Sequence, residues 1–196
     1  MNVIGLLRHG PTAWNLEKRI QGMTDTPLDP GFDPRPWRET LTAHGPWDFV
    51  ATSPLRRARD TARLLFPQCE PAIIPDLREQ NWGEWTGLTV AGLRRDHPGL
   101  IERQEALGWD FTPPGGESRR QVLARTLAAI DDAVLGRDGE RILMITHLGV
   151  IKILLNHLLG SPFLPGASAD VAKRALHLLT LDHGDLRVLG TNVRLS

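Results

Sequence analysis

Five side chains that can do chemistry together stand just beyond apolar segments of the sequence. They are two histidines, two arginines and one carboxylate: His9, His147, Arg8, Arg57 and Glu79. A neutral imidazole is a competent nucleophile near neutral pH, whereas a serine hydroxyl would need a base beside it. Guanidinium groups match the charged oxygens of a phosphoryl group, and a carboxylic acid can protonate a departing oxygen. These residue types together predict phosphoryl transfer.

The apolar segments before these residues predict the strands that position them. Short apolar runs bounded by turn signals occupy residues 3–7, 48–52, 72–74 and 141–146. A terminal hairpin is expected from residues 176–181 and 185–190. In open α/β sheets, ligands bind beyond the carboxyl ends of the strands. We therefore expect the five side chains to meet on one rim of a sheet.

Helices are expected between these strands. Ser53 and Pro54 suit the start of one, because serine is a good N-cap and proline fits the first turn. Others are predicted near residues 88–96, 99–107, 118–135 and 150–160, with loop and a short helix in 22–47. This alternation predicts an α/β fold, a three-layer α/β/α sandwich with a mostly parallel central sheet and helices on both faces. The length suits a single domain over residues 1–196.

Composition argues against several other classes of protein. Lys+Arg and Asp+Glu both number 23, so the basic excess typical of nucleic-acid binders is absent. The single cysteine, Cys69, cannot provide a disulfide framework. The N-terminus does not have the pattern of a signal peptide, and no run approaches the roughly 18 apolar residues of a membrane span. We expect a cytoplasmic protein with no nucleic-acid partner and no membrane partner.

Five ordered blocks of the sequence resemble the histidine phosphatase (phosphoglycerate mutase-like) superfamily. They are LRHG with RIQGMTDTPLD behind it, SPLRRA, LREQNWGEWTGL, PPGGES and ITHLGVIK, which together span residues 4 to about 152. The resemblance implies the phosphoglycerate mutase-like fold and the small phosphatase branch. It also implies a phosphoric monoester hydrolase of the histidine acid phosphatase type. Such an enzyme needs no metal and no cofactor, and it acts on a small phosphorylated metabolite.

The resemblance also implies roles for the residues that chemistry singled out. His9 aligns with the histidine that is phosphorylated, and Glu79 aligns with the proton donor. Arg8, Arg57 and His147 align with the pocket that holds the phosphoryl oxygens. The implied mechanism has two displacements: His9 first attacks phosphorus, and water then releases phosphate from the phosphohistidine.

Further substrate contacts are expected around this pocket. Asn15 aligns with an auxiliary phosphate ligand, and the Leu148 amide begins a predicted helix whose dipole favours an anion. Trp82 follows Glu79 in the same loop and is a candidate for either the core or the pocket wall. The expected substrate-binding residues are Asn15, Gln21, Gly22, Leu148 and Trp82.

Some assignments keep an alternative. Glu84 is the rival acid in the loop of Glu79, and Arg56 is expected to be an exposed neighbour of the pocket arginine. A cofactor-dependent phosphoglycerate mutase would use the same histidine and return the phosphoryl group to a glycerate product. Mutases of this type carry an additional basic segment after the glutamate loop, for which this chain offers only Arg94, Arg95 and Arg103. A non-catalytic phosphate-binding module is the third possibility.

Overall fold

One six-stranded sheet carries the site, in the strand order β3-β2-β4-β1-β5-β6. The structure is a computed structural model and describes residues 1–195. The strands are β1 (Asn2–Arg8), β2 (Phe49–Thr52), β3 (Ala72–Ile73), β4 (Arg141–Thr146), β5 (Ala175–Asp182) and β6 (Asp185–Arg194). Neighbours among β1 to β4 pair in parallel, whereas β5 is antiparallel to both β1 and β6. Only β5 runs against the others, so the mostly parallel sheet is confirmed.

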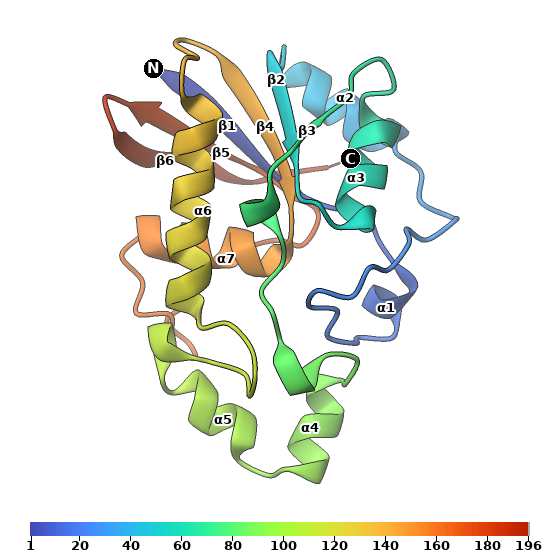
Figure 1. The fold of residues 1–196 in the computed structure, drawn as a ribbon, viewed down its shortest axis with the longest axis vertical. Coiled ribbons are helices and arrows are strands. Elements are labelled where there is room, and N and C mark those ends of the chain that lie inside the picture. Colours follow the sequence, from blue (N-terminus) through green and yellow to red (C-terminus); the bar gives the residue numbers. More distant parts are fainter. Residues whose placement is uncertain (196) are drawn as a thin grey trace.

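Helices cover both faces of this sheet (Figure 1). The α-helices are α1 (Ala13–Leu16), α2 (Arg35–Ala43), α3 (Arg56–Leu65), α4 (Val90–Asp96), α5 (Leu100–Glu105), α6 (Arg119–Val134) and α7 (Leu148–Leu158). Three short 3₁₀ helices are η1 (Pro75–Leu77), η2 (Gly83–Trp85) and η3 (Gly108–Asp110). Helices α2 and α3 pack on one face and α6 and α7 on the other, while α4 and α5 form a lobe beyond the sheet. The three-layer α/β/α architecture is confirmed.

Alternate residues of the central strands supply the two halves of the core. In β4, Ile142 and Met144 pack with apolar residues of α6 and α7. Leu143 and Ile145 point to the opposite face and pack with α2 and α3. Because both faces of β4 are buried, its sequence is a continuous apolar run rather than an alternating one. This is the reason that the strand was recognisable from the sequence.

The sequence predicts the start of α6 correctly but misplaces the start of α3. Ser118 caps α6 by accepting a hydrogen bond from the Gln121 amide, in a capping box. The prediction that Ser53 and Pro54 begin a helix is wrong, because α3 starts at Arg56 with no side-chain cap. The hydroxyl of Ser53 instead lies against His147.

Between the first two strands, residues 22–47 are loop with one short helix, as the sequence predicts. Within residues 22–47, α2 forms a helix of nine residues, and a proline occupies its first turn. Trp37 and Leu41 of α2 are buried against the sheet. In the part of the chain that the structure describes, no helix has the length and apolar character needed to cross a membrane.

Candidate active site

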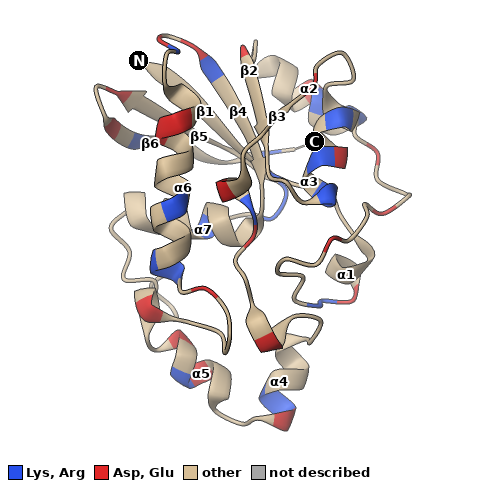
Figure 2. Cartoon of the chain, in the orientation of Figure 1, with Lys and Arg blue, Asp and Glu red and all other residues tan. Residues whose placement is uncertain are grey.

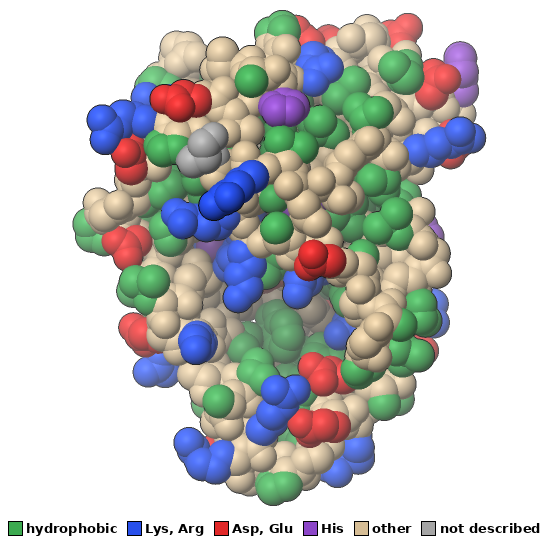
Figure 3. Space-filling view, turned by 180° about the vertical axis from the view of Figure 1, so that it is seen from behind, with side chains coloured by type: hydrophobic (Ala, Val, Ile, Leu, Met, Phe, Trp, Pro, Cys, Tyr) green, Lys and Arg blue, Asp and Glu red, His purple; other side chains and the backbone are tan. Residues whose placement is uncertain are grey.

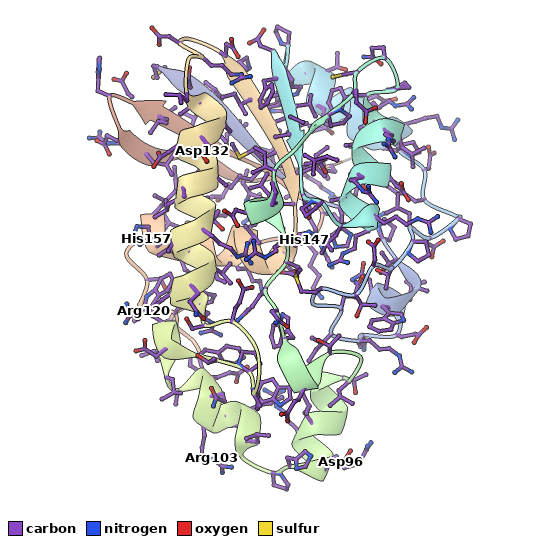
Figure 4. The ribbon with its side chains drawn as sticks, viewed as in Figure 1. Asp96, Arg103, Arg120, Asp132, His147 and His157 are labelled. Atoms are coloured by element: carbon purple, nitrogen blue, oxygen red, sulfur yellow. The ribbon has the colours of Figure 1, made fainter. Side chains whose placement is uncertain are left out.

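A cavity of about 460 Å³ opens beyond the carboxyl end of β1, beside the first turn of α7 and the loop after η1. Nine of the ten predicted site residues line it: Arg8, His9, Asn15, Gln21, Gly22, Arg57, Glu79, Trp82 and Leu148. The tenth, His147, is fully buried behind His9, and the centroids of the two rings are 5.2 Å apart. In Figure 4, His147 lies at the centre of the molecule, between the sheet and the lobe of α4 and α5.

The His9 imidazole is held in one orientation and one tautomer. Its Nδ1 lies 2.6 Å from the carbonyl oxygen of Gly10, and because a carbonyl only accepts, Nδ1 must donate. In the neutral ring, Nε2 then carries the free lone pair. Burial, followed by the charges of Arg8 and Arg57, holds the pKa of His9 well below its usual value. His9 is therefore a neutral, oriented imidazole with a free lone pair on Nε2.

A second imidazole, that of His147, lies beside the first. Nε2 of His147 lies 2.7 Å from Oγ of Ser53, and Nδ1 has no hydrogen-bond partner within residues 1–195. Burial chiefly, and then the charges of Arg57 and His9, lower the pKa of His147 well below its usual value. Ser53 is a site residue that sequence reasoning missed, because its position before a helix favoured a capping role.

Arg57 is a fully buried cation at the floor of the site. Its Nη1 donates to the carbonyl of Thr24 at 2.7 Å, and its Nη2 donates to the carbonyl of Gly22 at 2.9 Å. Burial lowers the pKa of Arg57 to about 10, so the group stays protonated at neutral pH. The guanidinium therefore fixes the loop of Gln21 and Gly22, which lines the cavity.

Arg8 and Asn15 offer unsatisfied donors to the same space. Nε of Arg8 is buried and has no partner within residues 1–195. Burial lowers the pKa of Arg8, against a smaller opposing effect of Glu79. Oδ1 of Asn15 accepts from the Thr12 amide at 3.1 Å, so only its amide nitrogen remains for an anion. Both side chains suit the binding of phosphate oxygens.

The carboxylate of Glu79 is placed by backbone amides from two segments. The Gln80 amide donates to Oε1 at 2.9 Å, and the Gly149 amide donates to Oε2 at 3.3 Å. Glu84, the rival acid, is exposed and lies outside the cavity lining. The structure thus places Glu79, and not Glu84, in the lining of the cavity that His9 also lines.

Sequence reasoning also missed the ion pair that holds the loop of Glu79. Nε of Arg125 lies 3.0 Å from Oε1 of Glu117, and the Arg125 side chain is only 8 % exposed. The same guanidinium donates to the carbonyls of Asp76, Arg78 and Glu79 at 2.7, 2.8 and 3.2 Å. The eight-residue separation of the pair gave no signal, since helical ion pairs are expected at three or four residues.

The other arginines that the sequence singled out lie away from the site. Arg56 is exposed and pairs with Asp60 at 3.2 Å. Arg94 pairs with Glu102 at 2.9 Å and Arg95 with Asp96 at 2.8 Å, within the mixed charges of α4 and α5 that Figure 2 shows. Arg103 lies at the outer end of the lobe in Figure 4, far from His147. None of these four arginines lines the cavity.

Comparison with known proteins settles the family to which this arrangement belongs. A sequence profile described as "Histidine phosphatase superfamily (branch 1)" matches residues 4–194. The chain belongs to the histidine phosphatase superfamily. The resemblance seen in the five sequence blocks is therefore confirmed.

Relatives in this superfamily include both phosphatases and mutases. The chain is 33% identical over 193 residues to a bifunctional protein of Mycobacterium tuberculosis, covering 93% of this chain but 48% of that protein, so it spans about half of that relative's length. It is 30% identical over 171 residues to 2,3-bisphosphoglycerate-dependent phosphoglycerate mutase 2 of Gloeobacter violaceus, covering 81% of this chain and 76% of that protein.

A solved phosphatase structure has the same fold across its whole length. It is the mycobacterial glucosyl-3-phosphoglycerate phosphatase in complex with VO3, with a TM-score of 0.83 and 26% sequence identity. The match covers 98% of this chain and 100% of that chain. The phosphoglycerate mutase-like fold and membership of a family of phosphoryl-transfer enzymes are thus established together.

Proposed function

We propose that this protein is a phosphomonoester hydrolase that acts on a small phosphorylated metabolite through a phosphohistidine at His9. The observation that carries the proposal is the state of that imidazole. Its Nδ1 donates to Gly10, its pKa is held low, and the guanidinium groups of Arg8 and Arg57 line the same cavity. Such a ring is nucleophilic at Nε2, and its surroundings favour the charged oxygens of a phosphoryl group.

The reaction follows as two displacements at phosphorus. In the first, Nε2 of His9 forms a bond to phosphorus, the phosphorus–oxygen ester bond breaks, and protonated Glu79 gives its proton to the leaving oxygen. In the second, Glu79 takes a proton from water, the water oxygen bonds to phosphorus, and the bond to His9 breaks. Arg8 and Arg57 neutralise the phosphoryl oxygens in both steps.

Each proposed step is carried out by side chains of the protein itself, and none uses a metal ion. No group of three or more His, Cys, Asp or Glu side chains among the described residues is arranged to hold one. The cations of the site are instead arginines, which supply charge and paired donors to a phosphate. The named activity of the mycobacterial structure, glucosyl-3-phosphoglycerate phosphatase, supports hydrolysis of a metabolite phosphate.

A phosphoglycerate mutase is the second candidate, favoured by the relative of that name in Gloeobacter violaceus. The basic segment expected of a mutase has no counterpart in the cavity lining, because Arg94, Arg95 and Arg103 lie outside it. Arg94 and Arg95 are paired with acids of their own lobe. The position of these three arginines outside the cavity, together with the named activity of the mycobacterial structure, favours hydrolysis over the mutase reaction.

One experiment tests both candidates. Phosphate release is measured over a panel of phosphomonoesters, with and without EDTA, beside a mutase assay primed with 2,3-bisphosphoglycerate. We expect hydrolysis that EDTA leaves unchanged, an acid-labile phosphoenzyme on rapid quenching, and loss of both in His9→Ala. The exposed His183→Ala variant should behave as the wild type. Turnover retained by His9→Ala, or mutase activity above hydrolysis, would overturn the proposal.

A further inference from the structure

All three lysines of the chain line the cavity of the proposed active site. They are Lys18, Lys152 and Lys173, which come from three distant parts of the sequence. Many of the surface arginines, by contrast, are paired with acids. No side-chain hydrogen bond or ion pair occupies the three ammonium groups within residues 1–195. Three unpaired ammonium groups around one cavity form a cluster that the proposed chemistry at phosphorus does not use.

Lys152 is the most constrained of the three. It is half-buried in α7, three residues after Gly149, and so lies on the same face of the helix about one turn further along. Burial lowers the pKa of Lys152, and the charges of Lys173, Arg8 and Arg119 lower it further, against a weaker effect of Asp170. A half-buried cation without a counter-ion costs free energy, which an anion in the cavity would offset.

Part of the cavity lining is apolar. Trp82, Phe111, Ile153 and Phe163 contribute to the lining. Figure 3 shows the molecule hollowed near its centre, with hydrophobic side chains in the hollow and Lys and Arg side chains around it. Such a lining suits a small ligand whose carbon skeleton contacts the apolar side chains and whose two ends carry negative charge.

We propose that Lys152 and Lys173 bind a second anionic group of the substrate, a carboxylate or a second phosphate. This inference rests on the proposed hydrolase function and narrows its substrates to small phosphomonoesters that carry another acid. Lys173 lies in the segment before β5 and also lines a neighbouring cavity of about 570 Å³ that shares Arg8 and His9. The two ammonium groups thus approach the substrate from different segments of the chain.

Matched pairs of substrates test this inference. In each pair the members differ in the second acid: 3-phosphoglycerate against glycerol 3-phosphate, phosphoserine against phosphoethanolamine, and fructose 1,6-bisphosphate against fructose 6-phosphate. We expect kcat/KM of the wild type to favour the member with the second acid by about tenfold or more, the scale of one charged hydrogen bond. The first two pairs report on a carboxylate and the third on a second phosphate.

Variants connect this preference to the lysines. Lys152→Met and Lys173→Met should each reduce the ratio of the two kcat/KM values towards one, whereas Lys152→Arg should keep it. Arg103→Met is the matched control, because Arg103 is an exposed cation outside the cavity lining, and its ratio should equal that of the wild type. Circular dichroism and thermal unfolding establish that each variant is folded.

The outcomes separate this inference from the function on which it rests. Equal kcat/KM for the members of every pair in the wild type, or a ratio unchanged by both Met variants, would overturn the inference and leave hydrolysis through His9 intact. Absence of phosphate release from every substrate would instead contradict the proposed function. Calorimetric binding of 3-phosphoglycerate and glycerol 3-phosphate to His9→Ala then still tests the lysines, because equal Kd values would overturn their role.

Discussion

The amide nitrogen of Gly149 lies 3.3 Å from Oε2 of Glu79 and joins the first turn of α7 to the loop after η1. This contact requires glycine for reasons of space. A Cβ atom added at position 149 would lie 2.4 Å from Oε1 of Glu79, closer than real Cβ contacts allow. The position of the proposed acid therefore depends on the absence of a side chain in the neighbouring helix.

Gly149→Ala should displace the Glu79 carboxyl group while leaving the fold intact. We expect kcat to fall by about 10–10² with substrates that have poor leaving groups, because small misplacements of a catalytic group have effects of this size. Steady-state kinetics over a series of aryl phosphates measures this, and the loss should shrink as the leaving group improves. Gly190→Ala is the control, since a Cβ there meets open space. Equal kcat in Gly149→Ala and the wild type would show that the contact does not matter.

Glu79→Gln and Glu84→Gln should differ sharply in their effects. Glu79 lines the cavity and loses its proton in the first step of the proposed reaction, so its variant should reduce turnover by about 10²–10⁴. Glu84 is exposed outside the cavity, and its variant should stay within about twofold of the wild type. Phosphate release by the two variants measures this directly. A larger loss in Glu84→Gln would reverse the assignment of the acid.

Ser53→Ala should weaken both the site and the fold. The change leaves Nε2 of the fully buried His147 without its partner at 2.7 Å, and an unsatisfied buried polar group costs about 1–3 kcal/mol. Urea unfolding measures this loss, and kcat should decline in the same variant. Ser168→Ala, at an exposed serine, should change neither quantity. A fully stable and active Ser53→Ala would indicate that His147 is held by packing alone.

Three buried histidines predict how stability depends on pH. The pKa values of His9 and His147 lie well below the usual value, and burial lowers the pKa of His177 to about 4. Below about pH 6.5 the unfolded chain binds protons that the folded chain does not. The contribution of these histidines to the free energy of unfolding should therefore reach its maximum above about pH 6.5. As the pH is lowered, the free energy of unfolding should fall by up to about 1.4 kcal/mol per pH unit for each histidine.

Urea unfolding between pH 7 and pH 5 measures this slope. His177→Phe removes one of the three groups and should make the slope shallower. His183→Gln, at an exposed position, should leave the slope as it is in the wild type. A slope that does not respond to His177→Phe would mean that this histidine is already protonated in the folded protein.

The parts of the fold that could be predicted from sequence are those in which local pattern and tertiary burial agree. Residues 141–146 were recognisable as a strand because both faces of β4 are buried, and the observed bounds are Arg141–Thr146. The start of α3 was misplaced because Ser53 has a contact 94 residues away that overrides its capping preference. The hairpin was predicted too short, since β6 continues to Arg194 with exposed residues along one side.

The candidate site divides in the same way. Residues within sequence motifs, such as His9 and Glu79, could be expected at one cavity in advance, and both line it. Residues that hold those groups in place could not, because Arg125 and Glu117 act through backbone carbonyls and amides of a loop distant in sequence. Lys152 was also missed, since a single lysine in an apolar helix has no local signal for the cavity it lines.

Arg57 donates hydrogen bonds to the carbonyls of Gly22 and Thr24, and these bonds limit which residues can replace it. Two arms of one planar guanidinium are already occupied on the protein side, and only its remaining edge is left for a ligand. A lysine would preserve the positive charge, but a single ammonium cannot reach both carbonyls and an anion in the same plane. Replacement of arginine by lysine is harmless on most protein surfaces. At position 57 it would remove hydrogen bonds that hold the loop of Gly22 and Thr24 in place.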